Sequence, residues 1–360
     1  MPISLEGRRH RPELTGYLAA AWSLVYGALG VYWAIGGAGF PFGLEHDPAA
    51  KLSLLSGVRQ ETGAPVVAVL GLVGAVAAMA MARALGGGAM RRALIAFGGV
   101  LAVGLAVLLP DFRVLAMIAY APIVLIGAPF GWPGRINIAD LFPWPIVNQV
   151  VCIVGGLVWA AATVVYQRRT RGACAYCGRS DRDTPSTSRE MVPWGRAAVR
   201  IAVIVPVLYA FTRWGWALGF PLGLSDDFFR EGQATGLWWR GAALATLALV
   251  GALLTLGLVR PWGEVFPRWV PFVGGRRVPM KLVVIPASFV SVVVLSAGLM
   301  FVRMGIAGTF RLGPYRVTFD ENFGALWPEL LWPVWGIALA AATLAYYYRT
   351  RRRCTICGRE

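Results

Sequence analysis

Long runs of apolar residues alternate with short polar segments along the whole chain. Eight of these runs can cross a bilayer, since a transmembrane helix needs about 20 residues. They lie at about 17–38, 64–84, 92–110, 146–167, 198–219, 237–259, 281–302 and 330–348. We therefore predict an all-α integral membrane protein with eight transmembrane helices, the first of which is too long for a cleaved signal peptide.

A further apolar stretch at 114–131 complicates this count. It follows the third run after a break that contains Pro110, Asp111 and Arg113. A ninth crossing that inverts the first half would move arginines such as Arg83 to the outer side, where arginine is disfavoured. We therefore predict that 114–131 is a re-entrant or interfacial helix on the outer side, and that Asp111 and Arg113 pair or reach water.

Composition agrees with a membrane protein and adds an orientation. The 360 residues are 57% apolar and 14% charged, with a formal net charge of +16. With eight crossings and the N-terminus inside, the inner segments hold 24 of the 34 basic residues and 7 of the 18 acidic ones. Arginine and lysine favour the cytoplasmic side, so we predict cytoplasmic N- and C-termini and contact with the anionic inner leaflet. This pattern also argues against nucleic-acid binding.

The chain repeats itself at half its length. Motifs recur with a constant offset of 180 residues: FPFGL at 40–44 as FPLGL at 220–224, AAAT at 160–163 as AAAT at 340–343, and CAYCGR at 174–179 as CTICGR at 354–359. We interpret this as a tandem duplication of a four-helix unit, with a first repeat at 1–180 and a second at 181–360. A unit with an even number of crossings gives two copies in the same orientation, so the repeats are predicted to be parallel.

Four of the five cysteines lie in the two CxxC motifs that end the repeats: Cys174, Cys177, Cys354 and Cys357. Two thiolates separated by two residues supply half of a tetrahedral metal site, and parallel repeats would supply the other half on the same side of the membrane. The reducing cytoplasm disfavours a disulfide, and closed four-sulfur coordination favours zinc. We predict a structural zinc site, with iron, a redox-active dithiol pair and unliganded thiols as the alternatives.

The two half-sites resemble the CxxCG knuckles of zinc ribbons and of rubredoxin-type iron sites. This resemblance covers about six residues in each repeat, and it implies metal coordination without any membrane function. The chain as a whole resembles the uncharacterised multipass membrane proteins of actinobacteria in its general pattern. Its basic residues are almost all arginine, with lysine only at Lys51 and Lys281. We interpret this bias as the codon usage of a high-GC bacterium, which places the protein in a bacterial inner (plasma) membrane.

Tryptophan side chains are more frequent in the predicted outer half of the membrane than in the inner half. An interfacial belt explains aromatic residues at both interfaces, so the asymmetry leaves room for an outer pocket that binds a lipophilic or cationic ligand. The residues predicted for that pocket are Trp33, Asp111, Arg113, Arg213, Trp214, Trp216, Trp238 and Trp239. Most other charged residues of the region, Glu329 among them, are interpreted as solvated loop residues. Arg213 is unusual because 201–212 carries no charge and because its repeat counterpart is Trp33.

Enzyme motifs are sparse in this sequence. Histidine occurs only at His10 and His46, which argues against His-based triads and the HExxH motif. The sequence therefore favours a non-enzymatic protein, and our first hypothesis is binding or transport of a small lipophilic or amphipathic molecule between the repeats. The alternatives are a membrane redox protein that uses the four cysteines with iron or as dithiols, and a scaffold subunit that docks a protein partner on its basic cytoplasmic face.

Overall fold

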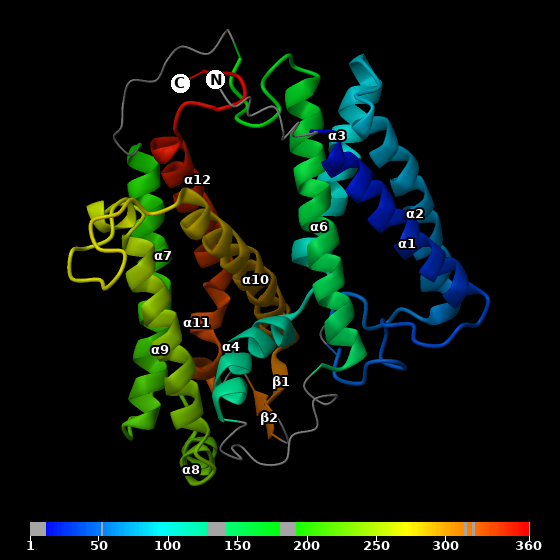
Figure 1. The fold of residues 1–360 in the computed structure, drawn as a ribbon. Coiled ribbons are helices and arrows are strands. Elements are labelled where there is room, and N and C mark those ends of the chain that lie inside the picture. The colour runs from blue at the N-terminus through cyan, green and yellow to red at the C-terminus, as the bar shows by residue number, and fades with distance from the viewer. Residues whose placement is uncertain are drawn as a thin grey trace. The chain divides into compact units, whose positions relative to one another are not determined.

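The computed structural model describes residues 12–51, 53–127, 142–180, 192–312, 315–318 and 321–359. Residues 1–11, at the N-terminus, and residues 181–191, at the start of the second predicted repeat, lie outside the described residues. Helices make up most of the described chain (Figure 1). The predicted helical fold class is therefore confirmed for this part of the protein.

Within the described ranges, seven helices are long and apolar enough to cross a membrane. They are α1 (Leu14–Ala34), α2 (Gln60–Ala82), α3 (Gly88–Val103) with its π-helical extension η1 (Gly104–Leu108), α6 (Trp144–Arg169), α7 (Pro193–Ala217), α9 (Leu237–Leu256) and α10 (Met280–Ala307). Each coincides with one of the first seven predicted spans to within a few residues. The set is consistent with a multipass membrane protein.

The eighth predicted span coincides with α12 (Trp332–Thr350), a helix of 19 residues. It is not among the seven spans. Its apolar centre is flanked by Trp332 and Pro333 at one end and by tyrosines 346–348 and Arg349 at the other, which lowers its hydropathy. The helix itself is therefore confirmed, and its crossing of the membrane stays a prediction.

The apolar stretch after the third span forms a separate helix, α4 (Phe112–Gly127), while 128–131 lie outside the described residues. The described part of α4 has 16 residues and ends where the described range ends. It begins after the predicted break at Pro110 and packs against α10, where the Phe112 and Phe301 ring centroids are 5.9 Å apart. Whether this stretch crosses the membrane or lies at its outer surface therefore stays a prediction.

The chain forms two compact units that exchange short segments between the two halves of the sequence. Unit 1 consists of Met1–Leu109, Pro143–Pro185 and Arg352–Glu360, and unit 2 of Pro110–Phe142 and Ser186–Arg351. Helix α4, from the first half, therefore belongs with the helices of the second half. The C-terminal tail, from the second half, belongs with the helices of the first half.

Close contact between backbones holds the helices of unit 1 together (Figure 1). Helix α1 packs along α2 and α6, and α3 packs along α6. A Cβ atom added to Gly71 would lie 2.4 Å from the Cα atom of Gly27, so α1 and α2 touch through glycine. Small residues allow this approach, which matters in lipid because no hydrophobic force drives helices together there.

Unit 2 is built on the same kind of helix packing. Helix α7 packs along α9 and α12, and α10 packs along α12. Its shorter elements are α8 (Asp226–Ala234), η3 (Pro261–Gly263), β1 (Thr309–Leu312), β2 (Tyr315–Thr318), η4 (Phe323–Ala325) and α11 (Trp327–Leu330). The two strands form an antiparallel hairpin in which Thr309 is opposite Thr318. The sequence analysis did not predict this hairpin, although β-branched and aromatic residues favour strands there.

The α1–α2 contact predicts the effect of a larger side chain at Gly71. Gly71→Leu is expected to lower the free energy of unfolding by roughly 1–3 kcal/mol, because the backbone of Gly27 leaves no room for the new side chain. Thermal unfolding of the detergent-solubilised protein measures the change. Gly99→Leu is the matched control, since nothing lies within 4 Å of a Cβ added at Gly99. Equal stability of the two variants would contradict the predicted contact.

Candidate metal centre

The first CxxC motif lies in a tight turn just after α6. The backbone N–H of Cys174 donates to the carbonyl oxygen of Arg179 at 2.9 Å, and the N–H of Gly178 donates to the carbonyl of Cys174 at 2.8 Å. Gly178 has a φ of +75°, a conformation that glycine adopts without strain. The glycine after the second cysteine thus lets the chain fold back around the two thiols.

The second CxxC motif, which follows α12, has the same backbone structure. The N–H of Cys354 donates to the carbonyl of Arg359 at 2.9 Å, and the N–H of Gly358 donates to the carbonyl of Cys354 at 2.8 Å. Gly358 has a φ of +71°. The two CxxCGR motifs, which differ only at the two positions between their cysteines, have therefore folded into the same turn.

Two arginines join the turns through reciprocal hydrogen bonds. Nη1 of Arg179 donates to the carbonyl oxygens of Arg352 and Arg359 at 3.0 and 3.1 Å, and Nη1 of Arg359 donates to the carbonyl of Arg179 at 3.0 Å. Such an exchange, in which each segment offers the other the same groups, is typical of a twofold-related contact. The sequence analysis missed this role of the arginines, although their place in both CxxCGR motifs was the available signal.

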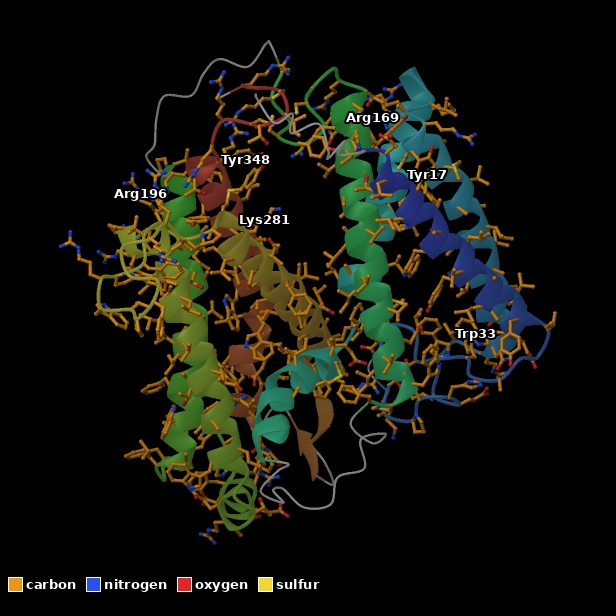
Figure 2. The ribbon with its side chains drawn as sticks, in the orientation of Figure 1. Tyr17, Trp33, Arg169, Arg196, Lys281 and Tyr348 are labelled. Atoms are coloured by element: carbon orange, nitrogen blue, oxygen red, sulfur yellow. The ribbon has the colours of Figure 1, made fainter. Side chains whose placement is uncertain are left out.

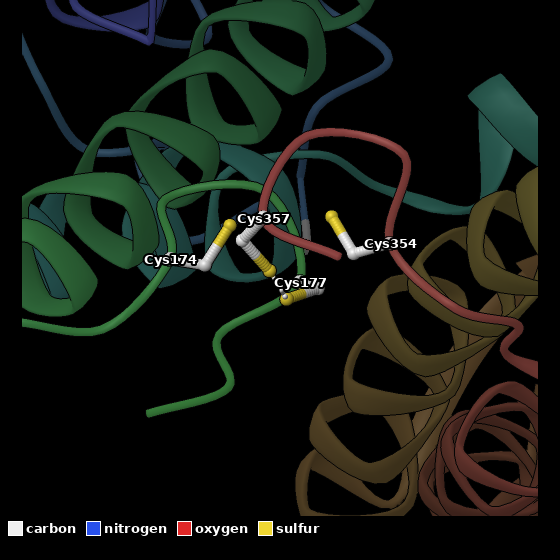
Figure 3. A group of neighbouring side chains, drawn as sticks. All are labelled: Cys174, Cys177, Cys354 and Cys357. Carbon is white, nitrogen blue, oxygen red and sulfur yellow. Dashed lines mark hydrogen bonds between the residues drawn. The ribbon is translucent and has the colours of Figure 1, made fainter. Parts of the chain in front are cut away.

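The four thiols converge in the space between the turns (Figure 3). All four Sγ atoms lie within 4.8 Å of one another, and those of Cys177 and Cys357 are 3.6 Å apart. None of the four is in a disulfide. A tetrahedral zinc ion with Zn–S bonds of about 2.3 Å would hold its sulfur ligands about 3.8 Å apart. The cluster is thus of the size that a four-sulfur metal site requires, and these cysteines could hold a metal ion.

All four cysteines belong to unit 1, although two of them come from the end of the chain. Cys174 and Cys177 follow α6, while Cys354 and Cys357 lie in the tail Arg352–Glu360, directly after the last residue of unit 2. The predicted meeting of the two motifs is therefore confirmed. A bound ion would close a long loop of the chain at this point.

The metal-free thiols differ in acidity. The backbone N–H of Cys357, directed at the sulfur of Cys354, lowers the pKa of Cys354 to about 7. Burial, followed by contact with the other three thiols, raises the pKa of Cys177 to about 11. Burial opposes ionisation of Cys174 as well, but the backbone N–H groups of Cys177 and Tyr176 outweigh it and lower its pKa. The lowered pKa values of Cys354 and Cys174 thus favour the thiolate form of one cysteine in each motif relative to an ordinary thiol, and the thiolate is the form that binds a cation.

The residues predicted for an outer ligand pocket fall into three places. Trp33 lies in unit 1, and the other seven belong to unit 2. Figure 2 shows Trp33 at the end of α1 that is opposite Tyr17. Its buried ring contacts Tyr26 and Phe40 edge-on, with centroid distances of 6.0 and 5.7 Å. Trp33 therefore packs within the protein core.

Four predicted tryptophans come together where α7 ends and α9 begins. The rings of Trp216 and Trp238 are 4.9 Å apart, and those of Trp214 and Trp239 are 6.0 Å apart. Trp216 and Trp238 are buried, and their indole N–H groups donate to backbone carbonyls. Trp239 is 54% exposed, as suits a lipid-facing aromatic residue near a helix end.

Arg213 lies beside this cluster and is buried. Its guanidinium carbon is 4.3 Å from the ring centroid of Trp216 and 4.7 Å from that of Tyr209. It forms an ion pair with Glu329 of α11 and donates to the carbonyl of Ala325 at 3.3 Å. Glu329 is buried too. The general interpretation of the charged residues of this region as mostly solvated therefore does not extend to Glu329, because Arg213 needs a counter-charge inside the protein.

A signal for this pair exists in the sequence. At the 180-residue offset the counterparts of Arg213 and Glu329 are Trp33 and Gln149, which are both uncharged. Both members of the pair are thus charged in the second half of the chain and neutral in the first. Two opposite charges that are both absent from the other repeat are expected to pair with each other.

Asp111 and Arg113 pair at the start of α4, as predicted. Nη2 of Arg113 lies 2.5 Å from Oδ2 of Asp111, and the backbone N–H of Arg113 donates to Oδ1 at 2.9 Å. Arg303 of α10 also interacts with the buried carboxylate of Asp111. The buried carboxylate of Asp111 is thus compensated by two arginines inside unit 2. Binding of a ligand by any of the eight residues stays a prediction.

Comparison with protein-family models, with curated proteins and with solved structures gave no match to this chain.

The acidities of the thiols predict their order of alkylation in metal-free protein. Cys354 should react first with iodoacetamide at pH 7–8 and Cys177 last, because only the thiolate is nucleophilic. The rate at Cys354 should fall as the pH drops below about 7. Peptide mass spectrometry after timed labelling measures each site. Cys152, buried in α6, is the unreactive reference, and faster labelling of Cys177 than of Cys354 would contradict the prediction.

The buried ion pair predicts a non-additive effect of mutation. Glu329→Gln is expected to lower the free energy of unfolding by about 3–5 kcal/mol, because it leaves the charge of Arg213 buried without a partner. The double variant R213M/E329M should be closer to the wild type, since it removes both charges and keeps similar volumes. Thermal unfolding in one detergent compares the variants. Simple addition of the effects of R213M and E329M would argue against the pair.

Proposed function

We propose that this chain is a multipass membrane protein in which a structural zinc ion ties the segment after α6 to the segment after α12. The ligands are Cys174, Cys177, Cys354 and Cys357. The observation that carries the proposal is the convergence of their four Sγ atoms to within 4.8 Å. Cysteines this far apart in the sequence gather in this way when one ion serves all of them.

The chemistry of the donor set favours zinc over other metals. Four thiolates in a closed cluster suit zinc, because structural zinc sites are four-coordinate and tetrahedral. Four thiolates and one zinc ion leave a net charge of −2, and Arg179 and Arg359, which bind the backbone of the opposite cysteine turn, add two positive charges to the same pair of turns. A site with four protein ligands leaves no position for water or substrate. The ion is therefore structural rather than catalytic.

Iron is the alternative, because rubredoxin-type sites also use four thiolates. It would turn the same cluster into a redox centre. The two metals differ in a simple observable, since iron bound by four thiolates is coloured and zinc is not. Metal analysis of the purified protein therefore distinguishes the two assignments.

The two halves of the chain are proposed to be parallel copies of one unit, with both termini in the cytoplasm. Equivalent hydrogen bonds support this proposal. The hydroxyl of Tyr166 donates to the carbonyl of Leu85 at 2.7 Å, and that of Tyr346 donates to the carbonyl of Gly263 at 2.8 Å. In unit 1, α6 is thus bound to the connection that follows α2. In unit 2, α12 is bound to the connection that follows α9. The two tyrosines are 180 residues apart, and the two carbonyl groups are nearly so.

Binding or transport of a lipophilic molecule, and docking of a protein partner, stay predictions of the sequence. Most of the side chains on which ligand binding was based are engaged by protein neighbours. Trp216 and Trp238 pack on each other, and Arg213 is paired with Glu329. The metal centre is therefore the better-supported basis for a function, and that function is to hold the end of the chain in place.

Metal analysis of the full-length protein in mild detergent tests the proposal. We expect about one zinc ion per chain in the wild type, and little metal in C174S or C354S, because each variant removes one of four ligands. These two variants should also unfold at lower temperature, since binding free energy contributes to folding.

The matched control is Cys152→Ser, which removes a cysteine buried in α6 and outside the cluster. It should retain the zinc. Red-brown protein with one iron ion per chain would show that the site binds iron instead of zinc, and the four-cysteine site would stand as proposed. Metal-free wild-type protein after expression with added zinc, or C174S protein with a full complement of metal, would contradict the site.

A further inference from the structure

The connection between α9 and α10 is much longer than the one between α2 and α3. It covers 257–279, whereas the connection between α2 and α3 covers 83–87. The connection between α2 and α3 contains no aromatic residue. The connection between α9 and α10 contains Trp262, Phe266, Trp269 and Phe272. The second half of the chain thus has an extended loop that the first half lacks.

The base of this loop is fixed on the end of α12. The carbonyl of Gly263 accepts the hydroxyl of Tyr346 at 2.8 Å, and the carboxylate of Glu264 pairs with Arg349 at 3.0 Å. Arg349 also donates to the carbonyl of Leu258 at 2.9 Å. The loop therefore begins from a defined position in unit 2.

Backbone hydrogen bonds close the rest of the loop. The N–H of Phe266 donates to the carbonyl of Arg276, and the N–H of Gly275 donates to the carbonyl of Phe266, both at 2.9 Å. An isolated bridge pairs Val265 with Arg277. Residues 267–274 thus form an ordered tip between two paired segments.

This tip presents two large aromatic side chains with almost no cover from the protein. Trp269 is 82% exposed and Phe272 is 94% exposed. Phe272 has a φ of +66°, a conformation that is rare and strained for a bulky residue. Exposed apolar surface of this kind, outside the helices, marks an interaction site.

Basic residues surround the two aromatic side chains. Arg268, Arg276, Arg277 and Lys281 are all exposed. The one acidic residue between 257 and 281 is Glu264, which is paired with Arg349 at the base. The surface around the tip is therefore strongly positive.

The loop lies where a membrane surface must be if α9 and α10 cross the bilayer. It joins the ends of these two helices, both of which are long and apolar enough to cross. Figure 2 shows Lys281, at the start of α10, at the same end of unit 2 as Arg196 and Tyr348. Headgroups are then the nearest material to an aromatic tip with basic neighbours.

We propose that Trp269 and Phe272 insert into the headgroup region of the inner leaflet, where Arg268, Arg276 and Arg277 contact the phosphates of anionic phospholipids. Tryptophan favours this depth because its ring is apolar and its N–H reaches polar groups. Arginine stems lie along apolar surface while their charged ends stay among phosphates. The positive charge is what selects an anionic lipid surface over a neutral one. The inference depends on the membrane crossing of α9 and α10 and on the cytoplasmic orientation given under the proposed function, and it is independent of the metal centre.

Fluorine NMR of the full chain in lipid nanodiscs tests this inference. The protein carries 5-fluorotryptophan, the Trp269 signal is assigned with W269F, and the discs contain a phospholipid with a nitroxide near its headgroup. In discs rich in phosphatidylglycerol, the Trp269 signal should broaden strongly. In the variant R268Q/R276Q/R277Q the broadening should fall at least about fivefold, since each arginine near an anionic surface contributes several-fold to the attraction.

Two controls make the result decisive. The signal of Trp159, which is fully buried, should not change in either protein, and the metal content should match that of the wild type. Broadening of Trp269 by a water-soluble relaxation agent, without broadening by the lipid nitroxide, would place the tip in water and overturn the proposal. Protection from both agents would mean that protein covers the tip, which would also overturn it. Equal broadening in phosphatidylglycerol and phosphatidylcholine discs would contradict the role of the arginines.

Discussion

Reciprocal hydrogen bonds between Arg179 and Arg359 hold the two cysteine turns against each other, and the candidate metal centre depends on them. Each guanidinium binds the carbonyl group of the other arginine, so neither turn can move away without leaving donors and acceptors unpaired. The sulfur atoms are brought together as a result. A metal ion bound there would add direct bonds to an arrangement that the backbone already favours.

This contact joins segments that are far apart in the sequence, so it strongly affects the conformational entropy of folding. Cys177 and Cys354 are separated by almost the whole second half of the sequence, and the tail that carries Cys354 belongs to unit 1. Closing a loop of this length costs conformational entropy, and a cross-link removes that cost from folding. The proposed zinc ion would thus act on the fold of the whole chain. This is a structural role that fits the lack of an open coordination position.

Buried charged side chains in the helical units are paired, because an unpaired charge is costly to bury. Arg213 and Glu329 are both buried and pair with each other, and Asp111 is buried against Arg113. An isolated charge at these positions would be strongly unfavourable in a lipid-surrounded protein. The exposed arginines of the loop between α9 and α10 have no such constraint. Their place at the ends of two apolar helices is the reason for assigning them to lipid phosphates.

The sequence by itself determined the helices and the ligand set of the metal centre. Apolar runs long enough to cross a bilayer predicted eight spans, of which seven coincide with helices of the required length and hydropathy. The repeated CxxCGR motif identified the four cysteines that converge. Both signals consist of local spacing. Spacing along the chain contains no information about which helix packs on which. The tertiary structure therefore decided that α4 joins the second unit, that the C-terminal tail joins the first, and that Glu329 is buried beside Arg213. These outcomes depend on contacts between distant segments, where packing and charge neutralisation act in three dimensions.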